Sequence, residues 1–437
     1  MLGKANEMNE TTSRRTFLDR TGKTVLGVTT VGSLTVPNTV RAAGSDTMRI
    51  GLIGCGGRGS GAAVQALQAD VNTQLVAVAD AFEDRMRASL RNLNRTEVAK
   101  RVDIPKDRQF VGLDAYQQLL GTDVDVVILA TPPGFRPLHL EAAVKAGKHV
   151  FAEKPAAVDA AGVRRVLAAS RLAKSKGLFV VAGLQGRYEP VQQDTISRLH
   201  DGAIGDITAM RMVRYGGGVW VRPREPKMTD VEYQMRNWYY FTWLSGDFLV
   251  EQFIHEIDRM AWIANGYPVR CLATGGRQLR TGKNYGHIYD HFAALFTFEG
   301  GADLYASTRH QRGCATSFDM VVHGTKGTCT GRGKTSFEIS GAKAWKTGGA
   351  RKKQNGHQLE HNAMYKALRG GDYINNGDYL AKSTLMAIMA RESAYTGQEI
   401  TWEQMENSKQ DLVPDNLHWN SKLPKWDIAI PGVTRFV

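Results

Sequence analysis

Five short apolar runs alternate with helical patterns along the first part of the chain. They cover residues 48–53, 73–79, 124–130, 149–152 and 178–182. Runs of this length without polar alternation are typical of strands buried on both faces of a parallel sheet. Because helical stretches separate these strands, the pattern predicts an α/β domain with a doubly wound parallel sheet that helices cover on both faces.

The pattern changes after about residue 185. Longer runs with partial alternation, typical of an antiparallel sheet with one open face, cover 207–214, 291–298, 302–308 and 318–323. Helices are expected over 245–263, 358–369 and 378–396. We therefore predict two domains, 46–185 and 186–437. The second is an α+β domain with an open-faced, mostly antiparallel sheet, through which copies of the chain would form a homo-oligomer.

The first 43 residues have a different pattern. Arg14-Arg15 precede Phe17 and Leu18, a mildly apolar stretch follows over 24–36, and small residues surround Ala42. This order of basic, apolar and small residues is typical of a secretory signal, and the paired arginines resemble a twin-arginine signal. The apolar stretch is too short to span a membrane. We expect a folded protein exported to the periplasm; an irregular tail on a cytoplasmic enzyme is the alternative.

Charge and cysteine content narrow the classes of partner. The formal charge is +13, but the basic residues are scattered and no nucleic-acid motif accompanies them. The four cysteines have no zinc-like spacing, so we expect free thiols in the core.

Two pairs of histidines have a spacing that could bind a metal on a helix. His287 and His291, and likewise His357 and His361, are four residues apart. The first pair is expected at a strand and the second lacks an evident third ligand, so we predict no metal site.

A glycine-rich loop follows the first strand. Gly54, Gly56 and Gly59 have the spacing G-x-G-x-x-G between a strand and a helix, and Asp80 ends the second strand. In this context the loop binds a dinucleotide diphosphate at the helix N-terminus, and the acid binds the adenosine ribose. The pattern predicts a Rossmann domain that binds NAD. NADP is the alternative, because Arg58 and Arg85 are basic residues near this loop and acid.

A family resemblance rests on later motifs. Residues 130–155 contain Ala-Thr-Pro-Pro, then His139, then Ala-Gly-Lys-His-Val-Phe-Ala-Glu-Lys-Pro. This segment resembles the hallmark of the Gfo/Idh/MocA oxidoreductase family, and the segments 185–188, 246–258 and 395–402 are similar to the family as well. The resemblance covers residues 48–405.

The resemblance implies a substrate between the open-faced sheet and the nicotinamide, with Lys154, His255 and Glu251 acting on the reacting hydroxyl. The cofactor-binding residues would be Gly54, Gly56, Gly57, Arg58, Gly59, Asp80, Thr131, Pro132, Pro133, His139, Glu153 and Lys154. The substrate-binding residues would be Arg187, Tyr188, Arg236, Asn237, Trp238, Gln252 and Asp258.

The same residue types suit the chemistry by themselves. Hydride transfer from an alcohol needs a base for the hydroxyl proton, and histidine titrates near neutral pH. Glu251 and His255 are one turn apart on the expected helix, so the carboxylate would orient the imidazole. The alternative is an amphipathic helix with a solvated polar stripe.

Export constrains the reaction. Outside the cytoplasm no NAD pool is available for exchange, so the enzyme would retain NAD and return it to its starting redox state in each cycle. Glycoside hydrolysis through oxidation, elimination, hydration and reduction meets this condition. The alternative is a glucose–fructose-type dismutase, or a simple dehydrogenase of a sugar or inositol. A further hypothesis is a non-catalytic sugar-binding protein that keeps NAD as a structural component.

Overall fold

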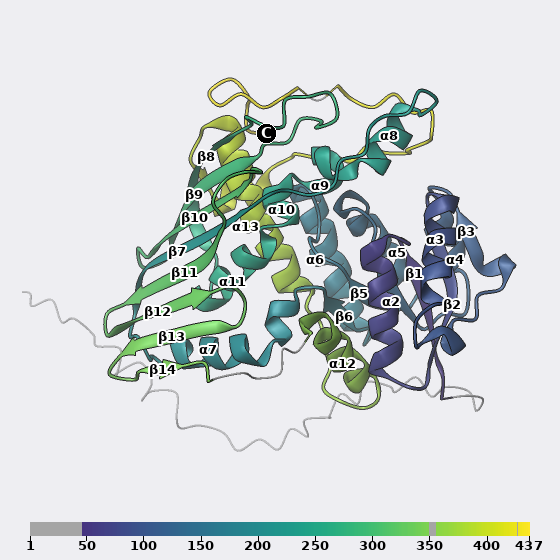
Figure 1. Cartoon of the computed structure of the whole chain (residues 1–437), viewed down its shortest axis with the longest axis horizontal. Helices are drawn as coiled ribbons and strands as arrows, with labels where there is room; N and C mark the ends of the chain where they lie inside the picture. The colour runs from purple at the N-terminus through teal and green to yellow at the C-terminus, as the bar shows by residue number, and fades with distance from the viewer. Residues whose placement is uncertain (1–45, 349–354, 426) are drawn as a thin grey trace, which may run out of the picture. The chain divides into compact units, whose positions relative to one another are not determined.

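The computed structural model describes residues 46–348, 355–425 and 427–437. Residues 45–437 form one compact unit that contains two sheets (Figure 1). The predicted signal segment, 1–43, lies outside the described residues, and the predicted division at residue 185 stays a prediction. None of the helices in the described ranges is long and apolar enough to cross a membrane.

The first sheet is parallel throughout and has the strand order β3-β2-β1-β4-β5-β6. Its strands are β1 (Met48–Ile53), β2 (Thr73–Asp80), β3 (Gln109–Val111), β4 (Val126–Leu129), β5 (His149–Ala152) and β6 (Val180–Ala182). This confirms the doubly wound parallel sheet. The strand β3 was not predicted because its three residues carry too little pattern.

Helices cover both faces of this sheet. They are α2 (Gly57–Ala69), α3 (Glu83–Leu93), α4 (Ala115–Leu120), α5 (Arg136–Lys145) and α6 (Ala160–Ser175). Alternate residues of β4 point into two separate cores: Val126 and Ile128 pack with α2, whereas Val127 and Leu129 pack with α4 to α6. Short 3-10 helices lie at η1 (Ala99–Arg101), η2 (Lys106–Arg108), η3 (Pro133–Phe135) and η4 (Gln185–Tyr188).

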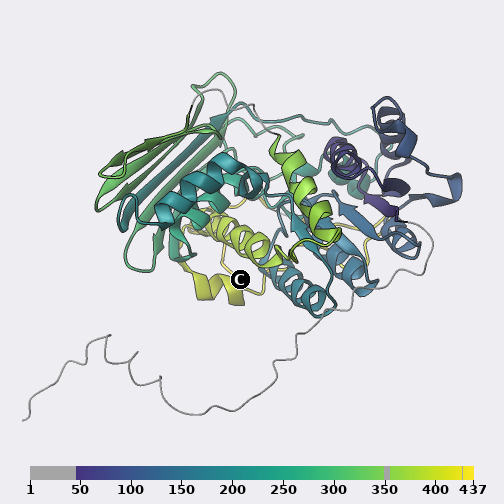
Figure 2. The same ribbon diagram turned by 90° about the horizontal axis from the view of Figure 1, so that it is seen from below.

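The second sheet has the order β14-β13-β12-β11-β7-β10-β9-β8-β15 and is antiparallel except for the β7–β10 pair. Its strands are β7 (Ile207–Gly216), β8 (Pro268–Gly276), β9 (His291–Phe298), β10 (Asp303–His310), β11 (Ser317–Gly324), β12 (Gly327–Arg332), β13 (Ser336–Gly341), β14 (Trp345–Lys346) and β15 (Ile400–Thr401). Figure 2 shows helices against one face of this sheet only, which confirms the open-faced architecture.

The helix expected over 245–263 is confirmed for most of its length, but it is not continuous. The segment forms three helices, α9 (Thr242–Ser245), α10 (Phe248–Glu251) and α11 (Ile254–Ala264). Gly246 and Asp247 both have positive φ, at 77° and 73°. The buried carboxylate of Asp247 caps α10 through the N–H of Phe248 and accepts the hydroxyl of Tyr395. These tertiary contacts, which spacing does not reveal, stabilise the break.

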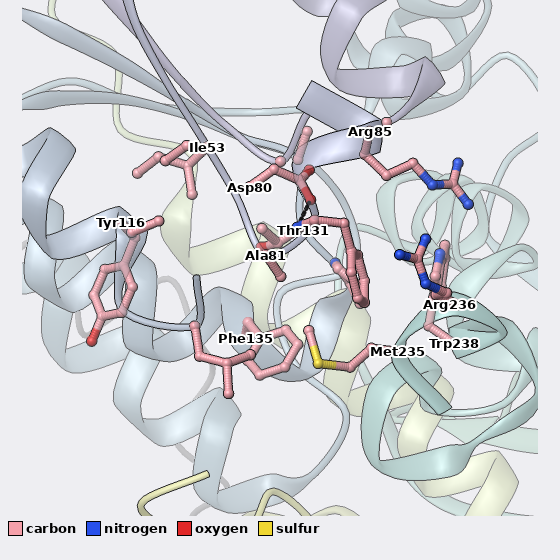
Figure 3. A pocket seen from close by; sticks show the side chains of 18 of the residues that line it. Ile53, Asp80, Ala81, Arg85, Tyr116, Thr131, Phe135, Met235, Arg236 and Trp238 are labelled. Carbon is pink, nitrogen blue, oxygen red and sulfur yellow. Dashed lines mark hydrogen bonds between the residues drawn. The ribbon is translucent and has the colours of Figure 1, made fainter. Parts of the chain in front are cut away.

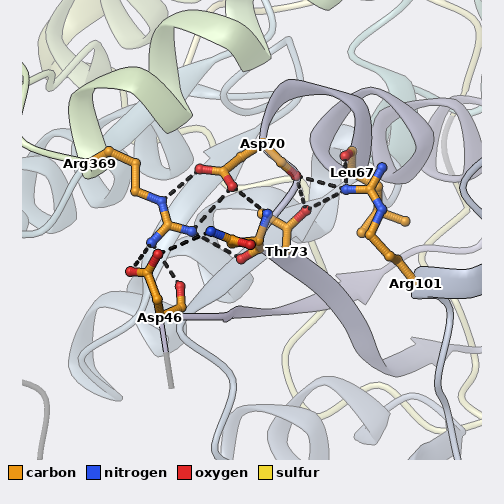
Figure 4. A network of polar contacts seen from close by, with 7 residues as sticks. Asp46, Leu67, Asp70, Thr73, Arg101 and Arg369 are labelled. Atoms are coloured by element: carbon orange, nitrogen blue, oxygen red, sulfur yellow. Dashed lines mark hydrogen bonds and ion pairs between the residues drawn. The ribbon is translucent and has the colours of Figure 1, made fainter. Parts of the chain in front are cut away.

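The remaining helices are α7 (Pro190–His200), α8 (Asp230–Arg236), η5 (Trp238–Tyr240), α12 (Gly356–Leu368), α13 (Gly377–Thr396) and α14 (Trp402–Asn407). Although α12 was expected in the second domain, it packs on α2 of the first sheet. Arg369, just after α12, forms ion pairs with Asp46 and Asp70 at 2.7 Å each (Figure 4). The chain therefore returns to the first sheet near its end.

The four cysteines are free thiols. Cys55, Cys271 and Cys329 are buried, as expected, whereas Cys314 is exposed, so its assignment to the core is wrong. Cys314 lies in the short connection between β10 and β11, where the chain turns through solvent.

Candidate active site

The glycines of the loop after β1 have two different roles. Gly54 has φ 99°, and a Cβ on it would lie 2.7 Å from the carbonyl carbon of Ala130. A Cβ on Gly59 would lie 1.9 Å from the carbonyl oxygen of Gly54, whereas a Cβ on Gly56 or Gly57 would meet nothing within 4 Å. Gly54 and Gly59 therefore permit α2 to pack against the sheet. Gly56 and Gly57 leave the backbone open where a diphosphate can approach the helix N-terminus.

Asp80 lies at the end of β2 and is held by the backbone around it. Its carboxylate accepts the N–H of Cys55 at 2.6 Å and the N–H of Phe82 at 2.8 Å. Burial raises the pKa of Asp80, and the two backbone hydrogen bonds oppose that increase. The carboxylate is thus oriented beside the glycine loop, in the position that binds an adenosine ribose in dinucleotide folds.

A cavity of about 360 Å³ joins the loop to Asp80 (Figure 3), a volume within the usual range for ligand sites. The predicted cofactor residues that line it are Gly54, Gly56, Gly57, Arg58, Asp80, Thr131, Pro132 and His139. Those outside its lining are Gly59, Pro133, Glu153 and Lys154. The open loop, the oriented acid and the cavity fit a bound dinucleotide.

His139 supports one wall of this cavity. Its Nδ1 lies 3.2 Å from the hydroxyl of Thr131, and its ring packs 4.3 Å from that of Tyr116, centroid to centroid. Burial and the neighbouring Arg136 lower the pKa of His139 to about 3. The imidazole is therefore neutral at neutral pH and positions Thr131 rather than binding a phosphate by charge.

Lys154 and Glu251 join the end of a strand of the first sheet to the end of α10. The Lys154 ammonium donates to the Glu251 carboxylate at 2.8 Å and to its backbone carbonyl at 2.6 Å, and both side chains are only 12% exposed. Lys154 follows β5, whereas Glu251 ends α10. The predicted pairing of Glu251 with His255 is wrong. The helix breaks between them, and the carboxylate turns to Lys154 instead.

His255 lies in the first turn of α11, next to this ion pair. None of the described residues forms a hydrogen bond with its ring. Its pKa is well below the usual value because of burial, and the charges of Lys154 and Lys334 lower it further. The imidazole is therefore neutral at neutral pH and is able to accept a proton.

The predicted substrate residues fall in several places. Arg187 and Asp258 form a two-pronged ion pair at 2.8 and 2.9 Å, so their charges satisfy each other. The hydroxyl of Tyr188 donates to Asn376 at 2.6 Å. Asn237 is fully buried and bonds to the backbone of the residues around it, which is a structural role.

Three further predicted substrate residues lie elsewhere. Arg236 and Trp238 line the cavity at the glycine loop and Asp80 rather than contacting Lys154. Gln252 is half-buried in the break between α10 and α11. Arg236 therefore contributes to the adenosine end of the site. Sequence spacing does not reveal this role, because it follows from the position of α8 beside the first sheet.

Sequence reasoning missed a polar cluster that two residues of α12 form with Glu153. Nδ1 of His357 lies 3.3 Å from the Glu360 carboxylate, and the ligand atoms of Glu153, His357 and Glu360 are within 4.8 Å of one another. His361 is not part of it and stacks on Phe151 at 4.0 Å. The i, i+3 spacing shows that His357 and Glu360 share a helical face, but not that this face meets β5.

The charges around this cluster oppose metal binding. Arg58 forms an ion pair with Glu153 at 2.8 Å. Burial lowers the pKa of His357 to about 4, and the cations Arg58, Lys334 and Lys154 contribute. Burial and the charge of Glu153 raise the pKa of Glu360 well above its usual value. A carboxyl group that favours its protonated form is a poor metal ligand, so the cluster is better explained as part of the polar floor beside Lys154 than as a metal centre.

Two parts of the chain match one protein family. Residues 48–183 match the GFO/IDH/MocA family described as an oxidoreductase family with an NAD-binding Rossmann fold. Residues 194–330 match the GFO/IDH/MocA C-terminal domain. Together these segments make up more than half of the chain, and the first contains the glycine loop, Asp80 and Lys154.

Individual relatives are distant. The inositol 2-dehydrogenase of Rhizobium meliloti is 25% identical over 293 residues, which are 67% of this chain and 78% of that protein. The trans-1,2-dihydrobenzene-1,2-diol dehydrogenase of Bos taurus is 27% identical over 266 residues, 60% and 70% of the two chains. The structure of levoglucosan dehydrogenase with NADH and L-sorbose has a TM-score of 0.66 at 17% identity, covering 81% of this chain and 98% of that chain. That similarity shows the shared fold.

Proposed function

The chain belongs to the Gfo/Idh/MocA oxidoreductase family and contains its NAD-binding Rossmann domain, and we propose that it transfers a hydride between bound NAD and a hydroxyl of a sugar, glycoside or polyol. The observation that carries the proposal is the Lys154–Glu251 ion pair, which joins the end of β5 to the end of α10, together with the neutral His255, whose pKa the Lys154 charge lowers. The relatives named as inositol, diol and levoglucosan dehydrogenases support a polyhydroxylated substrate.

Each residue has a defined task in this proposal. Bound NAD would accept the hydride from the carbinol carbon and return it. His255, neutral in the folded protein, accepts the hydroxyl proton, and the Lys154 ammonium donates a hydrogen bond to the same oxygen. Glu251 keeps the ammonium in place when no substrate is present.

We further propose that the cycle is redox-neutral and takes place after export. The twin-arginine-like segment supports export, and an exported enzyme has no NAD pool with which to exchange. A glycoside would be oxidised to a ketone, lose its aglycone by elimination, add water and be reduced again. A simple dehydrogenase is the second candidate, and the inositol 2-dehydrogenase relatives favour it.

Variants of His255 and Lys154 test the assignment of the site. His255→Asn and Lys154→Met should each lower turnover by ~10²–10⁴-fold while NAD binding and the folded state persist. His200→Asn, an exposed histidine on α7, is the matched control and should keep full activity. Near-normal turnover of His255→Asn would show that the proton goes elsewhere.

Incubation without added cofactor separates the two candidate reactions. The purified protein would be mixed with aryl glycosides and with free sugars, and aglycone release and NADH absorbance would be followed. Many turnovers per bound NAD without net NADH support the redox-neutral cycle. NADH formation that stops after one turnover and restarts on adding NAD⁺ would identify a simple dehydrogenase.

The open face of the second sheet supports a proposed homo-oligomer. Leu272, Leu295 and Tyr305 are 49%, 41% and 46% exposed, and the register of β8, β9 and β10 places them side by side. An apolar stripe of this kind is typical of an interface. Leu295→Glu should convert the oligomer to monomers in sedimentation analysis, and a monomeric parent protein would refute the proposal.

A further inference from the structure

The hydroxyl of Tyr239 is buried and lacks a hydrogen-bond partner. Tyr239 lies in η5 and is only 2% exposed. In the part of the chain that the structure describes, no group forms a hydrogen bond with this hydroxyl. Burying a hydroxyl without a partner costs free energy, so such groups are uncommon in folded proteins. A partner that a bound ligand supplies would remove this cost.

The segment around Tyr239 is well fixed, so loose packing does not explain the missing partner. The next residue, Tyr240, donates its hydroxyl to the carbonyl of Trp220 at 2.9 Å. The side chain of Asn237 is fully buried and bonds to one backbone N–H at 2.9 Å and one backbone carbonyl at 2.8 Å. Polar groups on both sides of Tyr239 are therefore satisfied within the protein.

Tyr239 lies beside both the cofactor cavity and the Lys154–Glu251 ion pair. Its ring centre is 5.6 Å from that of Trp238 and 6.3 Å from that of Trp220, and both tryptophans line the cavity. Burial raises the pKa of Tyr239, and the carboxylate of Glu251 raises it more than any other charge does. The side chain of Tyr239 is therefore close to the place where the reacting hydroxyl would bind.

Glu251 has an acceptor that matches this donor. Its Oε1 accepts the Lys154 ammonium at 2.8 Å, whereas its Oε2 has no hydrogen-bond partner in the ranges that the structure describes. Tyr239 and Glu251 form no hydrogen bond with each other. A carboxylate only accepts, and a phenol hydroxyl is able to donate. An alcohol does both, so one substrate hydroxyl is able to satisfy the two side chains together.

We propose that Tyr239 and Glu251 bind the substrate hydroxyl next to the reacting one, so that the preferred substrates are vicinal diols. Tyr239 donates to the oxygen of this second hydroxyl, and Glu251 accepts its hydrogen. Lys154 and His255 remain with the reacting hydroxyl. Adjacent hydroxyls of a sugar ring are about as far apart as the two members of the ion pair, which suits one hydroxyl for each. The proposal rests on the proposed hydride transfer and adds a substrate preference to it.

Tyr239→Phe tests the subsite, because it removes the hydroxyl and keeps the ring. Steady-state kinetics would be measured with glucose, an aryl glucoside, inositol and their monodeoxy analogues. For the wild type, we expect a raised KM for the analogue that lacks the hydroxyl beside the reacting carbon. Tyr239→Phe should raise the KM of the full substrate by about 3–10-fold, the loss of one hydrogen bond, and that of this analogue by less than about 2-fold.

Urea unfolding separates a binding role from a structural one. Because its hydroxyl has no partner in the described ranges, Tyr239→Phe should keep or raise the unfolding midpoint. The matched control is Tyr365→Phe, which removes another buried hydroxyl without a described partner, in the core between α12 and α2. That variant should keep both its midpoint and its KM. Tyr240→Phe loses an existing hydrogen bond and should unfold at a lower midpoint.

Three results would overturn the subsite. They are an unchanged KM in Tyr239→Phe, an equal loss on the full substrate and its deoxy analogue, and a midpoint as low as that of Tyr240→Phe, which would mean that the protein or a bound water already satisfies the hydroxyl. A wild type that turns over none of the compounds would instead count against the proposed hydride transfer. Titration calorimetry with the same compounds would then decide the subsite, which requires that Tyr239→Phe weaken binding of the full compound and spare its deoxy analogue.

Discussion

Two glycine substitutions in the same loop should have opposite consequences. Gly59→Ala places a methyl group 1.9 Å from the carbonyl oxygen of Gly54 and 3.2 Å from the Cβ of Ala130. Real Cβ atoms do not approach other heavy atoms closer than 3.0 Å. The 1.9 Å contact must therefore lengthen by about 1.1 Å, which requires α2 to move by that distance. Gly56→Ala places its methyl group where nothing lies within 4 Å.

The magnitudes follow from these contacts. Overpacking a rigid interior costs ~1–3 kcal/mol, and we expect Gly59→Ala at the upper end because the obstacle is backbone rather than a flexible side chain. Gly56 has φ −73° and ψ −178°, which alanine adopts without strain. Its substitution should change the cofactor-free stability by less than ~0.5 kcal/mol. The new methyl group, however, occupies the path of the diphosphate, so NAD should bind more weakly by ~10-fold or more.

Two measurements separate the effects. Urea unfolding of cofactor-free protein reports the stability of each variant, and NAD titration reports affinity. Gly59→Ala should lower the unfolding midpoint, whereas Gly56→Ala should unfold like the parent and lose affinity. A Gly59→Ala protein as stable as the parent would refute the packing argument. Unchanged NAD affinity in Gly56→Ala would show that the diphosphate does not approach this loop.

Three further predictions concern stability. Burial lowers the pKa of His287 to about 4, so below pH ~6.5 the unfolded state binds the extra proton and stability falls by ~1.4 kcal/mol per pH unit down to pH ~4; His287→Gln should remove this contribution in urea titrations at pH 7, 6 and 5. Arg369→Ala breaks the pairs with Asp46 and Asp70 and should cost ~0.5–1 kcal/mol, less at 0.5 M salt than at 20 mM; equal losses at both salts would contradict this. Lys154→Met leaves Glu251 buried without a partner and should cost ~3–5 kcal/mol, and adding Glu251→Leu should restore most of that loss in urea unfolding.

Patterns between near neighbours accounted for most of the correct predictions. The apolar runs gave the parallel sheet, because a strand buried on both faces needs apolar residues at every position. The glycine spacing located the loop that lines the cavity, since a tight turn into a helix constrains consecutive residues. The sequence-based prediction failed where one local pattern is compatible with two structures. Glu251 and His255 have helical spacing, yet α10 ends at Glu251 and α11 begins at Ile254, and the Glu251 carboxylate pairs with Lys154 instead.

The sequence by itself determined the fold class, the dinucleotide loop and the identity of Lys154 as a residue of interest. Only the tertiary structure decided what these residues contact. Lys154 meets Glu251 from 97 residues away, and the face of α12 that carries His357 and Glu360 returns to β5 after eight of the nine strands of the second sheet. The physical reason is that such contacts form when two separately folded elements bury their apolar faces together. The partner of a charged group is set by that packing, which no spacing within either segment encodes.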